Sequence, residues 1–303
     1  MVKYSIGDRM DEIIEKRKIN IKKILKYIIS FVIIIILILL YSRFIATTGL
    51  KVKEYNIINN KITDSFDGLK VIHLSDIHYG RTVNENEINK VVNKINFIRP
   101  DIVVITGDLL DRDTKLNEKQ IKTLTKALNH INTKYGKYAI TGNHDYKHDE
   151  WESIMENSGF INLNDTYDVI CNEKYENILI SGMSTNTYNK IDLKDKLSKT
   201  NEYLSNTNDN IIYQILIMHE PDFLTKFDYS NYDLVLAGHS HNGQVRLPFI
   251  GAIILPPNAK EYYNEYYNLG NTKLYISSGL GTSNIDFRLF NRPSINFYRI
   301  TNK

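Results

Sequence analysis

"LKVIHLSDIH", residues 69–78, has the pattern of a buried β-strand that runs directly into polar side chains. The first six residues are mostly aliphatic and β-branched, and Asp76 and His78 follow where the strand ends. Five later runs repeat this arrangement of an apolar strand followed by a polar or glycine-containing turn. They are "DIVVIT" (101–106), "KYAIT" (137–141), "NILISG" (177–182), "IIYQILIM" (211–218) and "DLVLAG" (233–238).

Helical periodicity separates several of these strands. In 84–100, apolar residues recur at helical spacing, Asn84 and Glu87 have the spacing of a capping box, and Pro100 marks the end. Residues 116–131 repeat the pattern. Further strands are expected in "QVRLP" (244–248), "KLYISSGLG" (273–281) and "SINFYRI" (294–300). This alternation of strands and helices predicts an α/β fold, in which helices cover the faces of a layered β-sheet.

The N-terminal segment has a different composition. A stretch rich in Lys and Arg (16–26) precedes sixteen uncharged residues, "YIISFVIIIILILLYS" (27–42). With snorkelling lysines at one end and "FIA" at the other, we expect a transmembrane helix over residues 27–46. A cleaved signal peptide is the main alternative, and a buried core helix is a weaker one because the run has no polar face.

Charge is distributed unevenly along the chain. Residues 1–50 contain nine Lys/Arg and four Asp/Glu, so the remaining residues carry a small negative net charge, although the whole chain is at +3. The positive charge before the apolar run predicts a cytoplasmic N-terminus and a body outside the cytoplasm. Nucleic-acid binding is not expected, because the main body has no basic excess.

Polar residues gather immediately after the predicted strands. They are Asp76 and His78, Asp108, Asn143 and His144, His219, and His239 and His241, so five of the eight histidines lie at such positions. Because the carboxyl ends of strands in an α/β sheet converge on one edge, we expect these side chains to share one cleft. Taken singly, each would more often be a turn, cap or structural residue.

Together these groups have the chemistry of a metal site. Carboxylates, imidazoles and an amide oxygen are ligands for divalent Mn, Zn or Fe, and their number exceeds what one ion needs. Two divalent ions about 3.5–4 Å apart would share a bridging carboxylate and bind a phosphoryl oxygen. The sequence therefore predicts a two-metal centre acting on phosphate esters.

The motifs "DIH", "GD", "GNHD", a single His219 and "GHSH", in this order, resemble those of the calcineurin-like metallophosphoesterase superfamily across residues 71–242. This resemblance implies a layered β-sandwich flanked by helices. "GHSHNGQVRLP" (238–248) and "SSGLGTSNIDFRLFNRPSI" (277–295) are similar to the bacterial membrane-associated subfamily described as UDP-2,3-diacylglucosamine-pyrophosphatase-like.

The resemblance also implies roles for single residues. Asp76, His78 and His241 would bind one metal, Asn143, His219 and His239 the other, and Asp108 would bridge them. His144 would face the substrate and protonate the leaving oxygen or stabilise developing charge, and Asp145 would orient its imidazole. Asn242 and Gln244 are candidates either for substrate binding or for capping their loop.

We therefore expect a basic cytoplasmic segment (1–26), a transmembrane anchor (27–46) and a metallophosphoesterase domain (47–303) outside the cytoplasm, single-pass in the cell membrane. The expected activity is hydrolysis of phosphoester bonds at the membrane surface, with metal-bound hydroxide attacking phosphorus of a phosphorylated lipid or nucleotide-sugar lipid. The alternatives are a phosphodiesterase acting on cell-wall or nucleotide phosphodiesters, and a catalytically silent domain that retains metals. "EYYNEYYN" (261–268) is either an amphipathic lip at the bilayer or an ordinary loop or edge strand.

Overall fold

The chain divides into two compact units, with the boundary between Ile45 and Ala46. The computed structural model describes residues 6–187 and 191–303. In the first unit, α1 (Ile6–Leu40) is continued by a short π-helix, η1 (Tyr41–Ile45). The basic stretch and the apolar run therefore form one continuous helix.

This helix is long enough to cross a bilayer. The candidate span, Arg9–Ile45, has 37 residues and contains a strongly apolar window, none of which is buried within the protein. A hydrocarbon core of about 30 Å needs only about 20 helical residues, so part of α1 would extend beyond it. A signal sequence meets the same criteria of length and composition, so the helix is a candidate membrane span.

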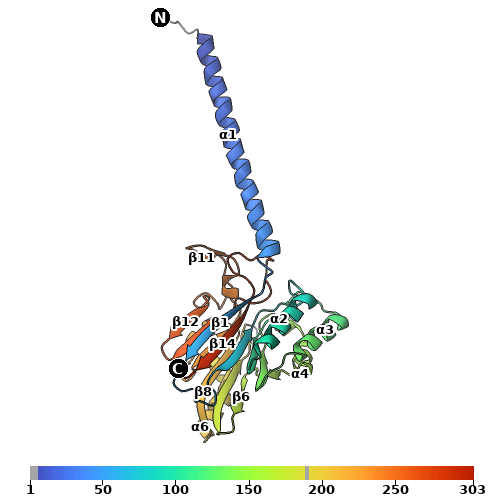
Figure 1. Cartoon of the computed structure of the whole chain (residues 1–303), viewed down its shortest axis with the longest axis vertical. Helices are drawn as coiled ribbons and strands as arrows, with labels where there is room; N and C mark the ends of the chain where they lie inside the picture. The colour runs from blue at the N-terminus through green and yellow to red at the C-terminus, as the bar shows by residue number, and fades with distance from the viewer. Residues whose placement is uncertain (1–5, 188–190) are drawn as a thin grey trace. The chain divides into compact units, whose positions relative to one another are not determined.

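Two six-stranded sheets form the second unit (Figure 1). The strands of the first sheet, in spatial order, are β1 (Lys51–Ile58), β14 (Ser294–Thr301), β2 (Leu69–Leu74), β3 (Ile102–Thr106), β4 (Gly136–Ile140) and β5 (Ile161–Asn162). Those of the second are β12 (Tyr266–Leu269), β13 (Thr272–Ile276), β9 (Leu234–Ala237), β8 (Asn210–Met218), β7 (Glu176–Met183) and β6 (Thr166–Cys171). Strands β2 to β5 are parallel, as are β7, β8, β9 and β13.

Alternate residues of each central strand face opposite sides. In β2, Val71 packs between the two sheets, whereas Ile72 and Leu74 pack against helices. In β8, Ile215 and Ile217 face the other sheet in the same way. Both faces of the central strands are covered, which explains why their sequences are almost continuously apolar.

Helices cover the outer face of each sheet. The first sheet packs against α2 (Glu85–Ile98), α3 (Glu118–Asn129) and α4 (Trp151–Asn157). The second sheet packs against three short helices, α5 (Leu193–Lys196), α6 (Ser198–Asn206) and η3 (Pro221–Lys226). These layers confirm the predicted α/β sandwich flanked by helices.

The structure adds strands that the sequence pattern did not predict. Strands β1 and β6 lie at sheet edges, where most of their side chains are exposed or half-buried. Because an edge strand has little apolar sequence, it lacks the signal by which the central strands were found. The second half of the tyrosine-rich stretch forms β12, as the edge-strand alternative predicts.

Candidate metal centre

The predicted ligands lie together, but two sheets supply them. Asp76, Asp108 and Asn143 follow β2, β3 and β4 of the first sheet, whereas His219, His239 and His241 follow β8 and β9 of the second. The expectation that one sheet edge provides the whole site was therefore wrong. The parallel strands of both sheets end on the same side of the sandwich, and their loops meet there.

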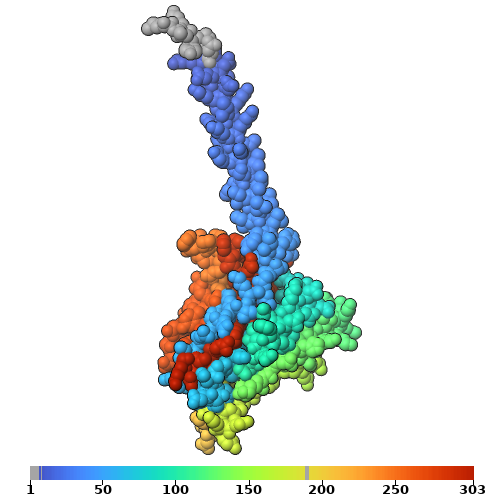
Figure 2. All heavy atoms as spheres, in the orientation of Figure 1, coloured from blue at the N-terminus to red at the C-terminus, as the bar shows by residue number. Residues whose placement is uncertain are grey.

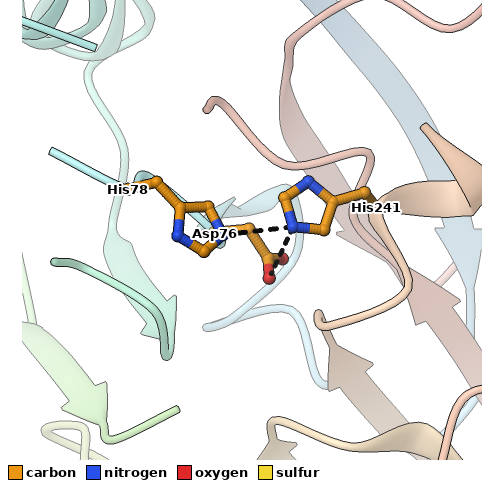
Figure 3. A group of neighbouring side chains, drawn as sticks. All are labelled: Asp76, His78 and His241. Carbon is orange, nitrogen blue, oxygen red and sulfur yellow. Dashed lines mark hydrogen bonds and ion pairs between the residues drawn. The ribbon is translucent and has the colours of Figure 1, made fainter. Parts of the chain in front are cut away.

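Asp76, His78 and His241 form the first group (Figure 3). Nε2 of His241 lies 3.4 Å from Oδ1 of Asp76 and 3.1 Å from Nε2 of His78. All three side chains are buried. Two imidazole nitrogens that face each other beside a carboxylate form a donor set suited to one cation.

Asp108, His219 and His239 form the second group, with their ligand atoms within 4.8 Å of one another. Oδ2 of Asp108 lies 3.4 Å from Nε2 of His219. The amide oxygen of Asn143 lies 3.0 Å from the same nitrogen. This group matches the ligand set that the resemblance implies for a second ion.

Asp108 lies between the two groups. Its Oδ2 atom is 3.7 Å from Nε2 of His78 in the first group and 3.9 Å from Nε2 of His144. Its other oxygen accepts a hydrogen bond of 2.7 Å from the backbone N–H of His144. One carboxylate thus reaches both groups while a backbone donor fixes its orientation.

The backbone at the candidate ligands is unusual. Asp76, His78, Asp108, His239 and His241 all have φ between 45° and 64°. Residues other than glycine seldom adopt this left-handed conformation, and it tends to cluster at functional sites. The loops therefore hold these side chains at a conformational cost that the rest of the fold offsets.

Two glycines allow the loops to approach closely. A Cβ atom at Gly107 would lie 2.6 Å from Cα of Gly142 and from Nδ1 of His219, and one at Gly142 would lie 2.3 Å from Oδ1 of Asp108. Both distances are shorter than any tolerable contact. The "GD" and "GN" pairs thus combine a ligand with the glycine that lets it approach its neighbours.

Hydrogen bonds to backbone carbonyls orient two of the imidazoles. Nδ1 of His219 lies 2.7 Å from the carbonyl oxygen of Thr106, and Nε2 of His239 lies 2.8 Å from that of Pro257. A ring nitrogen that donates to a carbonyl leaves the lone pair on the other nitrogen. In both residues that free nitrogen belongs to the second group.

The donor set fits divalent metal ions. Every group is an imidazole, a carboxylate or an amide, the ligand types of Mn, Zn and Fe. The carboxylates of Asp76 and Asp108 provide negative charge in a buried site, where uncompensated cations would be very costly. The residues present thus match a pair of divalent cations.

The pKa values describe the metal-free protein. Burial raises the pKa of Asp108, but the imidazoles of His219 and His144 lower it more, so it lies well below its ordinary value. Burial lowers the pKa of His219, and Asp108 reverses this and raises it well above its ordinary value. Because imidazole binds a metal ion in its neutral form, this raised pKa of His219 opposes metal binding at low pH.

Two other imidazoles, His241 of the first group and His239 of the second, have the opposite balance. Burial is the main cause of the lowered pKa of His241, and the neighbouring His78 and Arg288 lower it further. Burial and His219 likewise lower the pKa of His239. Neutral imidazoles are the form that binds metals, so these two residues need no deprotonation.

Asp145 has contacts that differ from the predicted ones. Its two carboxylate oxygens each accept a hydrogen bond of 2.9 Å, from the backbone N–H groups of Leu110 and Gly142. It therefore joins the loops after β3 and β4, and among the described residues these two backbone donors, and not the His144 ring, are its hydrogen-bond partners. Asp145 begins the short helix η2 (Asp145–Lys147).

Asp111 is the carboxylate beside His144, and the sequence analysis missed it. Its Oδ2 atom lies 3.6 Å from Nδ1 of His144 and 3.5 Å from Nδ1 of His78. It is buried, and this oxygen has no hydrogen-bond donor among the described residues. The signal was present in "GDLLD", where a second aspartate follows Asp108 by three residues.

Asn242 and Gln244 are used differently. Asn242 is buried, and its side-chain oxygen accepts a hydrogen bond of 2.9 Å from Nη1 of Arg246. The amide of Gln244 donates to the carbonyl oxygens of Ser283 and Ile285. Gln244 thus fastens its loop to the C-terminal part of the chain, as the capping alternative predicts, whereas Asn242 lies beside the ligand His241 in the short helix η4 (His241–Gly243).

Known proteins resemble this chain over most of its length. The profile of the calcineurin-like phosphoesterase family matches residues 69–243. The metallophosphoesterase YkuE of Bacillus subtilis is 30% identical, covering 86% of this chain and 88% of that protein. A metallophosphoesterase of Campylobacter jejuni is 30% identical, and the match covers 91% of this chain and 70% of that protein. A Danio rerio protein named as a transmembrane protein with a metallophosphoesterase domain is 28% identical, and the match covers 81% of this chain and 56% of that protein.

Proposed function

We propose that this chain, which belongs to the calcineurin-like phosphoesterase family and is a metal-dependent phosphoester hydrolase, uses two divalent ions to cleave phosphate esters at a membrane surface. One observation carries the proposal. Asp108 lies between two groups of buried nitrogen and oxygen ligands, 3.4 Å from His219 and 3.7 Å from His78.

The ligands divide between the ions as follows. Asp76, His78 and His241 would hold one, and Asn143, His219 and His239 the other, with Asp108 shared. Such a pair of cations supplies a nucleophile from water at neutral pH and neutralises charge on the phosphoryl oxygens. The fold contributes preorganisation, because strained backbone conformations hold five of the seven proposed ligands in place.

His144 is the proton donor of the proposed mechanism. Nδ1 of His144 accepts a hydrogen bond of 3.2 Å from the backbone N–H of Arg112. The neutral ring then carries its proton on Nε2, which is the nitrogen nearer to Asp108 and the ligand groups. Burial lowers the pKa of His144, but Asp108 and Asp111 outweigh it and raise the pKa above its ordinary value. A proton is therefore held where the leaving oxygen needs it.

The location at a membrane rests on α1. The apolar window of this helix, the positive charge before it and a relative named as a transmembrane protein all support an anchor. The charge bias favours a cytoplasmic N-terminus and a catalytic unit on the opposite side. A tether of this kind keeps the active site at high effective concentration relative to phosphates of the bilayer.

The favoured substrate is a phosphorylated lipid or a nucleotide-sugar lipid. Support comes from the anchor and from the resemblance of residues 238–248 and 277–295 to a lipid-directed subfamily. Cell-wall and nucleotide phosphodiesters are the second choice, because the same site chemistry would act on either.

Turnover by the purified full chain in detergent tests the activity. After metal removal, the chain is reloaded with Mn, Zn or Fe and given nitrophenyl phosphate, bis(nitrophenyl) phosphate and a series of membrane phospholipids. We expect metal-dependent hydrolysis of at least one ester, reduced in His144→Asn with unchanged metal content. Folded, metal-loaded protein that turns over none of these esters would instead support a metal-retaining binding domain.

A further inference from the structure

An apolar tip projects from the second unit between β10 (Arg246–Leu247) and β11 (Gly251–Ala252). Phe249 is fully exposed, Ile250 and Ile254 are each 71% exposed, and Ile253 is 53% exposed. Figure 2 shows this orange segment protruding from the surface of the unit. Contiguous exposed apolar residues on a soluble surface are unusual and mark contact sites.

The tip belongs to a small ribbon of its own, which the backbone hydrogen bond from Arg246 to Leu289 joins to the rest of the unit. Arg246 pairs with Ala252 and Leu247 with Gly251, which makes a two-stranded ribbon separate from both large sheets. Phe249, in the turn, has φ of 66°. A bulky residue in this conformation is strained, and here no burial offsets the strain. The ribbon therefore displays an aromatic side chain to its surroundings.

A basic pocket adjoins the ribbon. It has a volume of about 410 Å³, and Lys51, Lys53, Arg246 and Arg292 are among its lining residues. Its acidic residue, Glu265, is bound by Nζ of Lys53 at 2.5 Å. The pocket thus has a net positive charge and suits an anionic group.

The pocket shares a wall with the candidate metal centre. Asn242 and Asn291 line it, and Asn242 follows the ligand His241 directly. The side-chain amide of Asn291 donates a hydrogen bond of 2.6 Å to the carbonyl oxygen of His241. An anion held in the pocket would therefore lie beside the loop that carries a metal ligand.

The segment that joins the two units is short. Only five residues separate Ile45 from Lys51, and six backbone steps reach at most about 22 Å. Leu50 packs against the core of the second unit, and a Cβ atom at Gly49 would lie 3.3 Å from Nη1 of Arg292. The last residues of the linker therefore lie beside the pocket within the second unit.

We infer that the β10–β11 ribbon is a second membrane contact, which inserts its apolar tip into the boundary of the bilayer and presents the basic pocket to a lipid phosphate. This inference rests on the proposed anchoring of α1. An apolar tip, adjoining cations and a short tether together match an anionic lipid surface. A phospholipid headgroup is then the anion that the pocket takes, next to the metal centre.

Tryptophan fluorescence of the full chain in vesicles tests the insertion. The native Trp151 is buried and gives a constant background. Phe249→Trp adds a reporter at the tip. Tyr175→Trp is the matched control, because Tyr175 is an aromatic residue at the end of another strand connection, with φ of 57° and 80% exposure.

With brominated phospholipids in the vesicles, we expect the added emission of Phe249→Trp to be quenched and shifted to shorter wavelength, whereas that of Tyr175→Trp is not. Ile254→Trp provides a second reporter if the first variant folds poorly. Equal, unquenched emission from tip and control reporters would overturn the insertion. Because quenching does not depend on turnover, this experiment tests membrane insertion independently of the proposed activity.

The pocket has its own test. In vesicles that contain an anionic phospholipid substrate, we expect Lys51→Gln with Arg292→Gln to lower hydrolysis of the lipid more than hydrolysis of bis(nitrophenyl) phosphate. An equal loss on both substrates would contradict a headgroup site. If the wild-type chain hydrolyses no lipid but its tip reporter is quenched, the lipid substrate is rejected while the membrane contact remains.

Discussion

The candidate metal centre and the β10–β11 ribbon break the usual distribution of polar and apolar residues in opposite directions. At the metal centre, Asp76, Asp108 and several histidines are buried. At the ribbon, Phe249 and its isoleucine neighbours are exposed. Both departures oppose folding, since burying charge and exposing apolar surface are each unfavourable.

Of these two unfavourable arrangements, only the burial of polar residues can be recognised from the sequence. The buried polar residues follow predicted strands, so their position identifies them. The exposed apolar residues resemble core residues until the structure shows that nothing covers them.

Replacing the shared carboxylate should have the largest effect. Asp108→Asn removes the charge between the two ligand groups, so we expect loss of bound metal and a fall in turnover of more than about 10³-fold. Elemental analysis and hydrolysis of bis(nitrophenyl) phosphate measure both effects. Full activity in this variant would mean that Asp108 is not a shared ligand.

Removing the proposed proton donor should spare the metals. We expect His144→Asn to lower turnover by about 10²-fold or more, because an asparagine cannot transfer the proton. The metal content should equal that of the wild type. A drop in metal content would show that His144 is itself a ligand, as its distance of 3.9 Å from Asp108 would allow.

Asp111 should act through the ring beside it. Because the carboxylate helps to raise the pKa of His144, Asp111→Asn should lower that pKa and shift the basic limb of the pH–rate profile to lower pH. Turnover should fall by about 10- to 100-fold, as for other residues that position a catalytic group. A purely structural role would leave the profile in place.

Asp145→Asn is the matched comparison. In Asp145→Asn the side-chain NH2 group would face the backbone N–H of either Leu110 or Gly142, and one hydrogen bond would be lost. We therefore expect the free energy of unfolding to fall by about 1–3 kcal/mol. The basic limb of the pH–rate profile should stay where it is. If Asp145→Asn shifts the profile and Asp111→Asn does not, the original assignment of Asp145 is restored.

His73 is a buried polar residue outside the ligand groups, and it predicts a pH dependence of stability. Burial lowers its pKa to about 3 from an ordinary value of 6.5. Between these values the unfolded chain binds a proton that the folded chain does not, so stability falls as pH falls through this window. The contribution is about 1.4 kcal/mol per pH unit.

Denaturant unfolding of metal-free protein between pH 6.5 and 4 measures this slope. His73→Gln should remove the contribution of His73 and leave that of the other histidines. Identical slopes in the wild type and the variant would show that His73 is protonated in the folded state.

The ribbon should contribute least to stability. Phe249 packs against nothing and has a strained backbone, so Phe249→Asn should change the free energy of unfolding by no more than about 0.5 kcal/mol. Thermal unfolding in detergent measures this. A large loss of stability would mean that Phe249 serves the fold, and would weaken its assignment as a membrane contact.

The central strands, the helices α2 and α3, and the clustering of the proposed ligands were predictable from sequence because each has a local signal. The division of the strands between two sheets followed only from the family resemblance, since strands buried on both faces have the same pattern in one sheet or two. Asp111 was missed because its contact with His144 depends on the path of the loop. "QVRLP" was predicted as a strand, but only Arg246–Leu247 is one, and the exposure of the following residues depends on tertiary structure.

Anomalous scattering from crystals of the full chain loaded with Mn or Zn tests the central claim most directly. The account predicts two ions, one among Asp76, His78 and His241 and the other among Asn143, His219 and His239, with Asp108 contacting both. A single ion, or ions bound away from these side chains, would contradict it.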